Sequence, residues 1–242
     1  PNHWVQFISN MEEIIPVQEK ECSLLSQEFV GYTKNAEGFR HQDSFEMSDF
    51  PTYRYRVFGV ELEKRIVMKH EENLLLLSYN IVNRSENPVR IRLKPWLRFT
   101  KKGDMPLQGQ TFELRRDCMS SKGYTLQYKT DGRIQVDEAS WQKDLYFEDD
   151  AKDERDSVGS AFSTHSYVYD LMPGEVRDAY VMYGLKDINE SPSEIMENET
   201  ARKKELLKRA DVNSGLAKKL VLAADAFVVD RDSTGGKTIL AG

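Results

Sequence analysis

The stretch from Tyr53 to Phe99 restricts the fold of this chain most, because it predicts three or four adjacent β-strands separated only by turns. Large side chains alternate across two faces in Tyr53–Phe58, and Gly59 allows a tight reversal into Val60–Met68. The apolar run Leu74–Val82 is typical of a strand covered on both faces, so we expect it in the middle of a sheet.

The strand expected after the turn at Asn83–Pro88 has one face in water. Two sets of side chains alternate along it, the apolar Val89, Ile91 and Leu93 and the basic Arg90, Arg92 and Lys94. Pro95 then removes a backbone donor, which ends the pattern. Such a meander cannot bury its apolar faces alone, so a second sheet has to cover it. Two stacked antiparallel sheets form a β-sandwich.

The remainder of residues 1–190 continues the strand pattern. Residues 1–20 are compatible with two short strands around Pro16. Beyond Pro95, strand signals recur about every ten residues, as all-β domains show. They lie at Thr111–Arg116, Tyr124–Lys129, Arg133–Asp137, Leu145–Phe147, Phe162–Tyr169 and Val176–Leu185. We therefore predict a mainly β chain whose residues 1–190 form one large antiparallel two-sheet sandwich.

The pattern changes at Ser191, where a helix start is well marked. Ser191 suits the capping position, Pro192 the first helical position and Glu194 the third. Two helices are expected, over residues 192–210 and 214–229, and we assign residues 191–242 to a helical linker. The second helix carries an apolar stripe for packing, made of Leu216, Leu220, Ala223, Ala224 and Phe227.

Composition restricts the class of function. The net charge of −6 disfavours a general polyanion-binding role, so we expect no nucleic-acid partner. No apolar run approaches the ~20 residues of a membrane helix, so no membrane partner is expected either. Cys22 and Cys118 lie far apart, which favours reduced thiols in a cytoplasm over a disulfide framework. The chain opens at Pro1 without a leader and stops at Gly242, which predicts a piece of a longer polypeptide.

The residue types that usually carry catalysis form no motif here. The four histidines, His3, His41, His70 and His165, are isolated from one another and from the cysteines, so neither a metal site nor a cofactor is predicted. The charge run from Asp149 to Asp156 lacks the central glycine and closing glutamate of a calcium loop. We interpret it as a solvated loop.

Aromatic residues are the one feature that points toward a ligand class. Trp96 and Trp141 offer flat faces on which sugar rings stack, and Arg98 could donate hydrogen bonds to sugar hydroxyls. These three residues are the predicted carbohydrate contacts. The competing interpretation is that the tryptophans pack in the core or at a sheet edge, because strands favour aromatic residues anyway. The basic side chains of residues 90–98 are expected to face solvent or an acidic partner domain.

Three segments together resemble the amino-terminal domain of bacterial and archaeal glycogen debranching enzymes of the amylo-α-1,6-glucosidase family. The first is Phe50–Tyr55 with Gly59 and Leu62-Glu63-Lys64 leading to Met68, the second is Tyr79–Asn83 with Val89–Pro95, and the third is Leu222–Val229 followed by Lys237–Gly242. In the family, a segment similar to the third runs directly into an (α/α)6 barrel that holds the glycosidase carboxylates.

The resemblance implies a supersandwich-like domain with linker helices, and it assigns hydrolysis of α-1,6-linked glucosyl branches to a catalytic barrel absent from this chain. No catalytic residue is carried over. Relatives tend to have an Arg-Asp-x-His type stretch after the Pro95 strand, whereas this chain has Thr100–Asp104. A role for the 100–110 loop at the barrel mouth is therefore not assigned.

Three functions remain open at this point. The leading hypothesis is a non-catalytic domain of a cytoplasmic glycogen-debranching glycoside hydrolase, which supports its own C-terminal catalytic domain and helps to bind glycogen or branched maltooligosaccharides. The second is an independent carbohydrate-binding module. The third is a mutarotase-like sugar epimerase, which needs a histidine and a carboxylate converging in one pocket.

Overall fold

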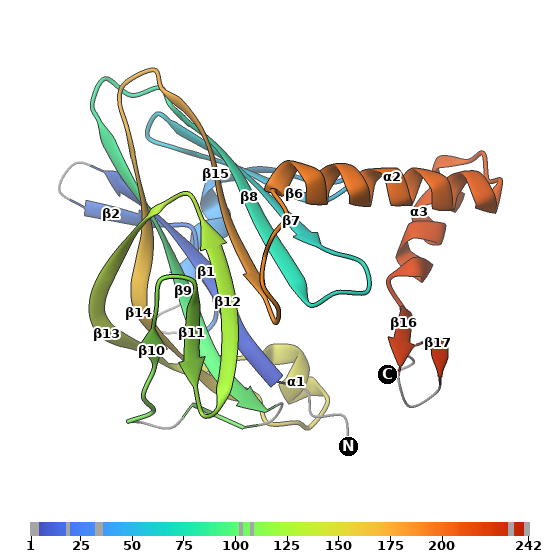
Figure 1. Cartoon of the computed structure of the whole chain (residues 1–242). Helices are drawn as coiled ribbons and strands as arrows, with labels where there is room; N and C mark the ends of the chain where they lie inside the picture. Colours follow the sequence, from blue (N-terminus) through green and yellow to red (C-terminus); the bar gives the residue numbers. More distant parts are fainter. Residues whose placement is uncertain are drawn as a thin grey trace.

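Two antiparallel sheets face each other in a computed structural model that describes residues 5–17, 20–31, 36–101, 104–106, 109–231 and 235–239 (Figure 1). The larger sheet has eight strands, in the spatial order β10 (Glu113–Leu114), β11 (Cys118–Ser121), β12 (Tyr124–Thr130), β15 (Val176–Gly184), β8 (Leu74–Asn83), β7 (Val60–Met68), β6 (Pro51–Val57) and β5 (Gln42–Met47). The smaller sheet has five, in the order β13 (Arg133–Tyr146), β14 (Val158–Leu171), β9 (Val89–Lys101), β1 (Val5–Val17) and β2 (Lys20–Ser23). The predicted mainly β, two-sheet fold is confirmed.

Short elements lie between the strands of the two sheets. They are the ribbon of β3 (Ser26–Gln27) and β4 (Ala36–Glu37), the 3-10 helix η1 (Gly38–His41) and the helix α1 (Glu148–Lys152). The charge run interpreted as a solvated loop thus begins with a short helix, in which Lys152 pairs with Glu148 at 3.1 Å. Trp4, His3, residues 102–103 and 107–108 of the 100–110 loop, and residues 240–242 lie outside the described residues.

The hairpins predicted from Tyr53 to Val82 are formed, and β6, β7 and β8 are neighbours in the larger sheet. Phe58 and Gly59 form the first turn with φ of 45° and 85°. Two successive residues with positive φ match the right-handed twist of the strands they join. Glycine, which has no Cβ, adopts the positive φ of the second position at little energetic cost. β8 lies between β15 and β7, in the middle of the sheet as expected.

The fourth strand of that stretch behaves differently, because β9 crosses to the smaller sheet, where it pairs with β1 and β14. It also continues through Pro95 to Lys101. Between the pairs Leu93–Tyr167 and Leu97–Phe162, β14 has one more residue than β9. This bulge lies opposite the segment that contains Pro95, and proline within a sheet is found at edges or bulges. Similarly, β1 is one strand that retains Pro16, where two short strands were expected.

The main core fills the space between the sheets. Its largest fully buried members include Leu62, Tyr79, Ile81, Ile91, Leu93, Leu97, Phe99 and Tyr167. One polar cluster crosses this core: the Glu13 carboxylate of β1 accepts a hydrogen bond from the Tyr79 hydroxyl at 2.8 Å and pairs with Lys64 Nζ at 2.7 Å. Glu13 is only 2% exposed. The polar cluster therefore joins the two sheets by directional contacts.

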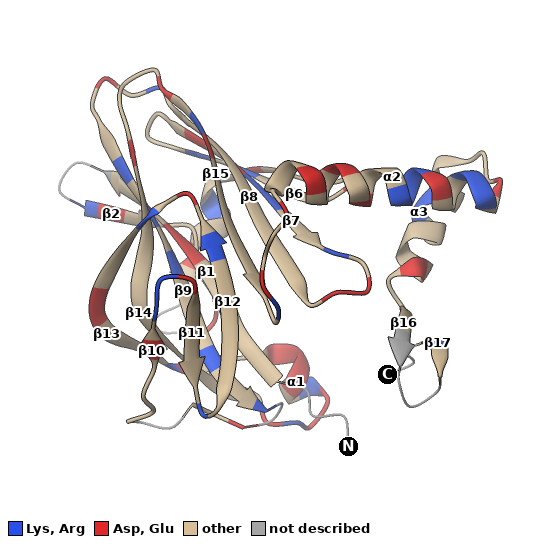
Figure 2. Cartoon of the chain, viewed as in Figure 1, with Lys and Arg blue, Asp and Glu red and all other residues tan. Residues whose placement is uncertain are grey.

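Helix α2 (Pro192–Ala210) covers part of the outer face of the larger sheet (Figure 1). Its predicted start is confirmed, because Ser191 and Glu194 form a complete capping box. Ile195 is buried in a second apolar cluster with Phe50, Val67, Leu74, Leu76 and Met182. β8 is thus covered on both faces, as its apolar run predicts. Acidic and basic side chains are interspersed along the exposed part of α2 (Figure 2).

Helix α3 (Gly215–Asp225) ends before the expected residue 229. The chain turns where Phe227 N donates to Ala224 O at 3.1 Å, and the ribbon of β16 (Val228–Arg231) and β17 (Gly236–Ile239) follows. Val228 and Val229 are β-branched and favour the strand over the helix. None of the helices within the described residues is both long and apolar enough to cross a membrane.

Candidate functional site

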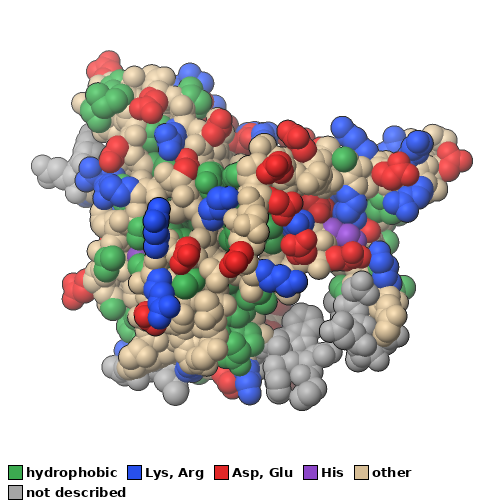
Figure 3. All heavy atoms as spheres, viewed as in Figure 1, with side chains coloured by type: hydrophobic (Ala, Val, Ile, Leu, Met, Phe, Trp, Pro, Cys, Tyr) green, Lys and Arg blue, Asp and Glu red, His purple; other side chains and the backbone are tan. Residues whose placement is uncertain are grey.

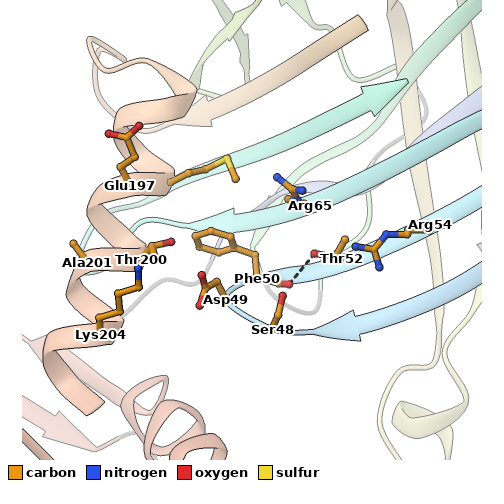
Figure 4. A pocket seen from close by; sticks show the side chains of 11 residues that line it. Ser48, Asp49, Phe50, Thr52, Arg54, Arg65, Glu197, Thr200, Ala201 and Lys204 are labelled. Carbon is orange, nitrogen blue, oxygen red and sulfur yellow. Dashed lines mark hydrogen bonds between the residues drawn. The ribbon is translucent and has the colours of Figure 1, made fainter. Parts of the chain in front are cut away.

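A groove of about 540 Å³ lies between α2 and the outer face of the larger sheet (Figure 4). Its lining comprises Ser48, Asp49, Phe50, Thr52, Arg54, Arg65, Met196, Glu197, Thr200, Ala201 and Lys204. The sheet wall comes from the β5–β6 turn and from the outward side chains of β6 and β7. The helix wall comes from one side of α2. This α2 groove has the volume of many small-molecule sites.

The base of the α2 groove is fixed by Phe50. Its side chain is 6% exposed and packs with Ile195 of α2 in the second apolar cluster. Lys203 Nζ lies 4.5 Å from the centroid of the Phe50 ring and donates to the main-chain oxygen of Asp49. Burial lowers the pKa of Lys203, and these contacts offset part of that cost. The turn and the helix are thereby held together.

Two arginines form the sheet wall, and a shared glutamate orients them. Arg54 Nε donates to Glu63 Oε2 at 2.7 Å, and Arg65 approaches Glu63 Oε1 at 2.5 Å. Arg54 also contacts Glu46 at 3.2 Å, and its bonds to Glu46 and Glu63 raise the pKa of its guanidinium. Such exposed pairs add little stability, but a bridged guanidinium has fewer rotamers to lose when a ligand binds.

The helix wall carries groups with no internal partner. Within the described part of the chain, Lys204 and Glu197 make no hydrogen bond or ion pair, and Thr200 adds a half-buried hydroxyl. Figure 4 shows Lys204 and Thr200 extending from α2 on the side of Phe50 and Asp49. The groove thus offers donors and acceptors, which is the requirement for binding a ligand that does both.

Trp96, the first predicted carbohydrate contact, is 5% exposed. It packs with Leu145 and Ala161 in a third apolar cluster, and its indole N–H donates to Glu12 Oε2 at 2.8 Å. Lys94 Nζ lies 4.7 Å from its ring centroid. These contacts occupy both the polar and the apolar parts of the side chain.

Arg98 and Trp141, the other two predicted contacts, lie on opposite faces of the smaller sheet. Trp141 pairs across the sheet with Phe162, which pairs with the inward-facing Leu97, so Arg98 points the other way. Arg98 donates to Gln6 Oε1 and to the main-chain oxygen of Asp104, both at 3.0 Å. Burial lowers the pKa of Arg98. Trp96 and Arg98 thus share a face that Trp141 does not, and a glucan contact at any of them stays a prediction.

No histidine lines the α2 groove, so the described residues bring no histidine and carboxylate together there. His165 is fully buried beside the Tyr167 hydroxyl, at 3.1 Å, and burial lowers its pKa to about 4. His70 lies 3.4 Å from Glu71 in the β7–β8 turn. Among the described residues, no three His, Cys, Asp or Glu side chains gather as a metal ion would require.

The α2 groove was not predicted from the sequence. The alternation in Tyr53–Phe58 does place Arg54 on the face opposite Tyr53, and the capping motif at Ser191 does locate α2. No pattern, however, indicates that α2 lies across that face. Phe50, an aromatic residue between a turn and a strand, is the one local signal of an outside contact.

Comparison with known proteins gives one family. Residues 1–177 match the family model described as "Glycogen debranching enzyme N terminal". The matched part of the chain ends at the start of β15 and does not include α2. None of the curated proteins compared with the chain matches it. Among solved structures, a polysaccharide lyase aligns with a TM-score of 0.39 and 11% identity, over 75% of this chain and 25% of that chain. The chain thus spans about a quarter of that lyase.

Proposed function

This chain belongs to the glycogen debranching enzyme N-terminal family, and on that premise we propose that it is the non-catalytic β-sandwich domain of a debranching glycoside hydrolase. The parent enzyme would be a cytoplasmic amylo-α-1,6-glucosidase that hydrolyses α-1,6-glucosidic branches. Its reaction would belong to a catalytic domain that follows this one, and this chain would support that domain and help it to bind glucan.

The observation that carries the proposal is the apolar face of α3, which the described residues leave exposed. Leu216 is 70% exposed and Leu220 62%, and they lie one turn apart on one side of the helix, while Phe227, which is 57% exposed, follows just after the helix end. Large contiguous apolar patches on a protein surface usually mark an interaction site. We infer that this face packs against the catalytic domain, which makes α3 the structural connection between the two.

The position of α3 is held by a chain of polar contacts. Glu199 of α2 is 5% exposed, and its carboxylate accepts from the main-chain N–H of His70 at 2.7 Å and from Arg202 Nε at 2.9 Å. Arg202 then donates to Asp225 of α3 at 2.7 Å. Lys237 of β17 pairs with Glu71 at 2.8 Å. The larger sheet, α2, α3 and the terminal ribbon are thereby connected, as a supporting element requires.

The first test is activity of the isolated chain on a phosphorylase limit dextrin. We expect no glucose release, and measurable release that persists through purification would contradict the proposal.

The second test concerns α3 and needs a longer polypeptide that includes the proposed catalytic domain. The double variant Leu216→Asp/Leu220→Asp should leave the unfolding midpoint of the isolated chain unchanged, because both side chains are exposed. It should lower both the Tm and the debranching activity of the longer protein. Lys219→Ala, a change at an exposed neighbour on the same helix, is the matched control. Equal Tm values for the double variant and the wild type in the longer protein would refute the role of this face.

A further inference from the structure

We propose that the α2 groove is a binding site for a stretch of α-glucan chain. The class of ligand rests on the proposed function, whereas the location rests on the geometry of the groove. The predicted contacts at Trp96, Arg98 and Trp141 are a separate location, on the smaller sheet.

The walls of the α2 groove are formed before any ligand arrives. Ile195 is 1% exposed within the apolar cluster that also contains Phe50, so α2 cannot move away from the sheet without exposing core. The contacts of Lys203 with Phe50 and Asp49 close the same junction. A preformed site binds with a smaller loss of conformational entropy than a site that must assemble.

The charges of the α2 groove favour a neutral ligand over an anion. Arg54, Arg65 and Lys204 are basic and Asp49 and Glu197 acidic, and Glu63 pairs with both arginines at the wall. With both signs present, no net positive field remains to attract phosphate or carboxylate. On the face shown in Figure 3, charged side chains of both signs are likewise interspersed.

A sugar hydroxyl donates one hydrogen bond and accepts others, and the groove supplies both kinds of partner. Lys204 and the arginines donate, Asp49 and Glu197 accept, and the hydroxyls of Ser48 and Thr200 do both. Met196 adds an adaptable apolar surface for the C–H faces of a sugar ring. A polar groove with a small apolar part thus matches an uncharged polyhydroxylated chain.

The test uses the full chain with 13C-labelled methionine methyl groups, titrated with maltoheptaose. Met196 lines the groove and should shift in a saturable way. Met172, which is 61% exposed in the β14–β15 turn, should not move. Inorganic phosphate should leave Met196 unchanged.

Two variants locate the contact. Arg65→Ala and Lys204→Ala should each raise the Kd for maltoheptaose about tenfold, the effect of one lost charge-assisted hydrogen bond. Both side chains are exposed and Lys204 has no internal partner in the described residues, so folding should be retained, which urea unfolding checks. Lys219→Ala on α3 is the control and should leave the Kd unchanged.

Three outcomes would overturn the inference. In a second, 15N-labelled sample, shifts of the Trp96 or Trp141 indole signals with Met196 unmoved would place glucan binding on the smaller sheet and leave the proposed function standing. A shift of Met196 with phosphate but not with maltoheptaose would make the groove an anion site. No shift anywhere with millimolar maltoheptaose would remove glucan binding from this chain, while its support of a catalytic domain would still be judged by the α3 variants.

Discussion

Replacing Trp96 separates a core role from a sugar-contact role. The side chain is 5% exposed, so Trp96→Ala removes a large buried ring and leaves a cavity beside Leu145 and Ala161. Such truncations cost about 3–5 kcal/mol. The lost indole N–H leaves Glu12 Oε2 without its donor, although Glu12 Oε1 keeps its bond from Ser23 at 2.7 Å. We therefore expect a loss of about 4 kcal/mol, a large fraction of the ~5–15 kcal/mol that stabilises a typical domain.

The conservative variant Trp96→Phe distinguishes the two contributions. It keeps most of the apolar volume but removes the indole hydrogen bond, so only about 1–2 kcal/mol should be lost. Urea unfolding followed by far-UV circular dichroism measures both variants, and glycogen affinity electrophoresis then measures binding by the folded protein. If Trp96→Ala unfolded at the wild-type urea concentration and lost glycogen binding, the ring would be a surface contact and our reasoning about its burial would be wrong.

Three further perturbations test other parts of the fold. Because burial lowers the pKa of His165 from 6.5 to about 4, the unfolded chain binds the proton more readily, so up to about 3 kcal/mol of stability should be lost as the pH falls from ~6.5 to ~4. His165→Gln should flatten that pH dependence of the urea midpoint, and an unchanged slope would contradict it. A Cβ at position 38 would overlap main-chain atoms of Leu24, so Gly38→Ala should abolish cooperative unfolding in calorimetry. Gly215→Ala, with open space around it, should not lower the Tm. Lys64→Met leaves the Glu13 carboxylate buried without its cation and should cost about 3–5 kcal/mol. The triple variant Glu13→Leu/Lys64→Met/Tyr79→Phe, which also removes the hydroxyl that donates to Glu13, should restore most of that loss. Additive losses in the triple variant would show that the three groups are not coupled.

Local patterns predicted those elements whose signals lie within a few neighbouring residues. The hairpin at Gly59 follows from the positive φ its turn requires, and the start of α2 follows from the capping box at Ser191. The position of β8 inside its sheet follows from a run that is apolar on both faces. In each of these cases the sequence signal lies within the residues of the element itself, so no distant segment is needed to predict it.

The misses depend on contacts between distant segments. β9 pairs with strands of the other sheet, and the bulge opposite its proline lies in β14, many residues later in the sequence. The burial of Trp96 depends on Leu145 and Ala161, which the sequence does not place beside it. The α2 groove exists only because α2 folds back over β6 and β7. Periodicity along one segment carries no information about such pairings.

The carboxylate of Glu13 has a consequence for how this domain can change over time. Two sheets that contacted each other only through apolar side chains could shift relative to each other in small steps, because the alternative arrangements would have similar free energies. The Glu13 carboxylate must contact both the Lys64 ammonium and the Tyr79 hydroxyl of the opposite sheet, and only one alignment of the two sheets permits this. We therefore expect relatives either to keep all three groups or to replace them together with apolar ones, since an intermediate that lost one alone would leave an isolated charge or an unmatched polar group in the interior.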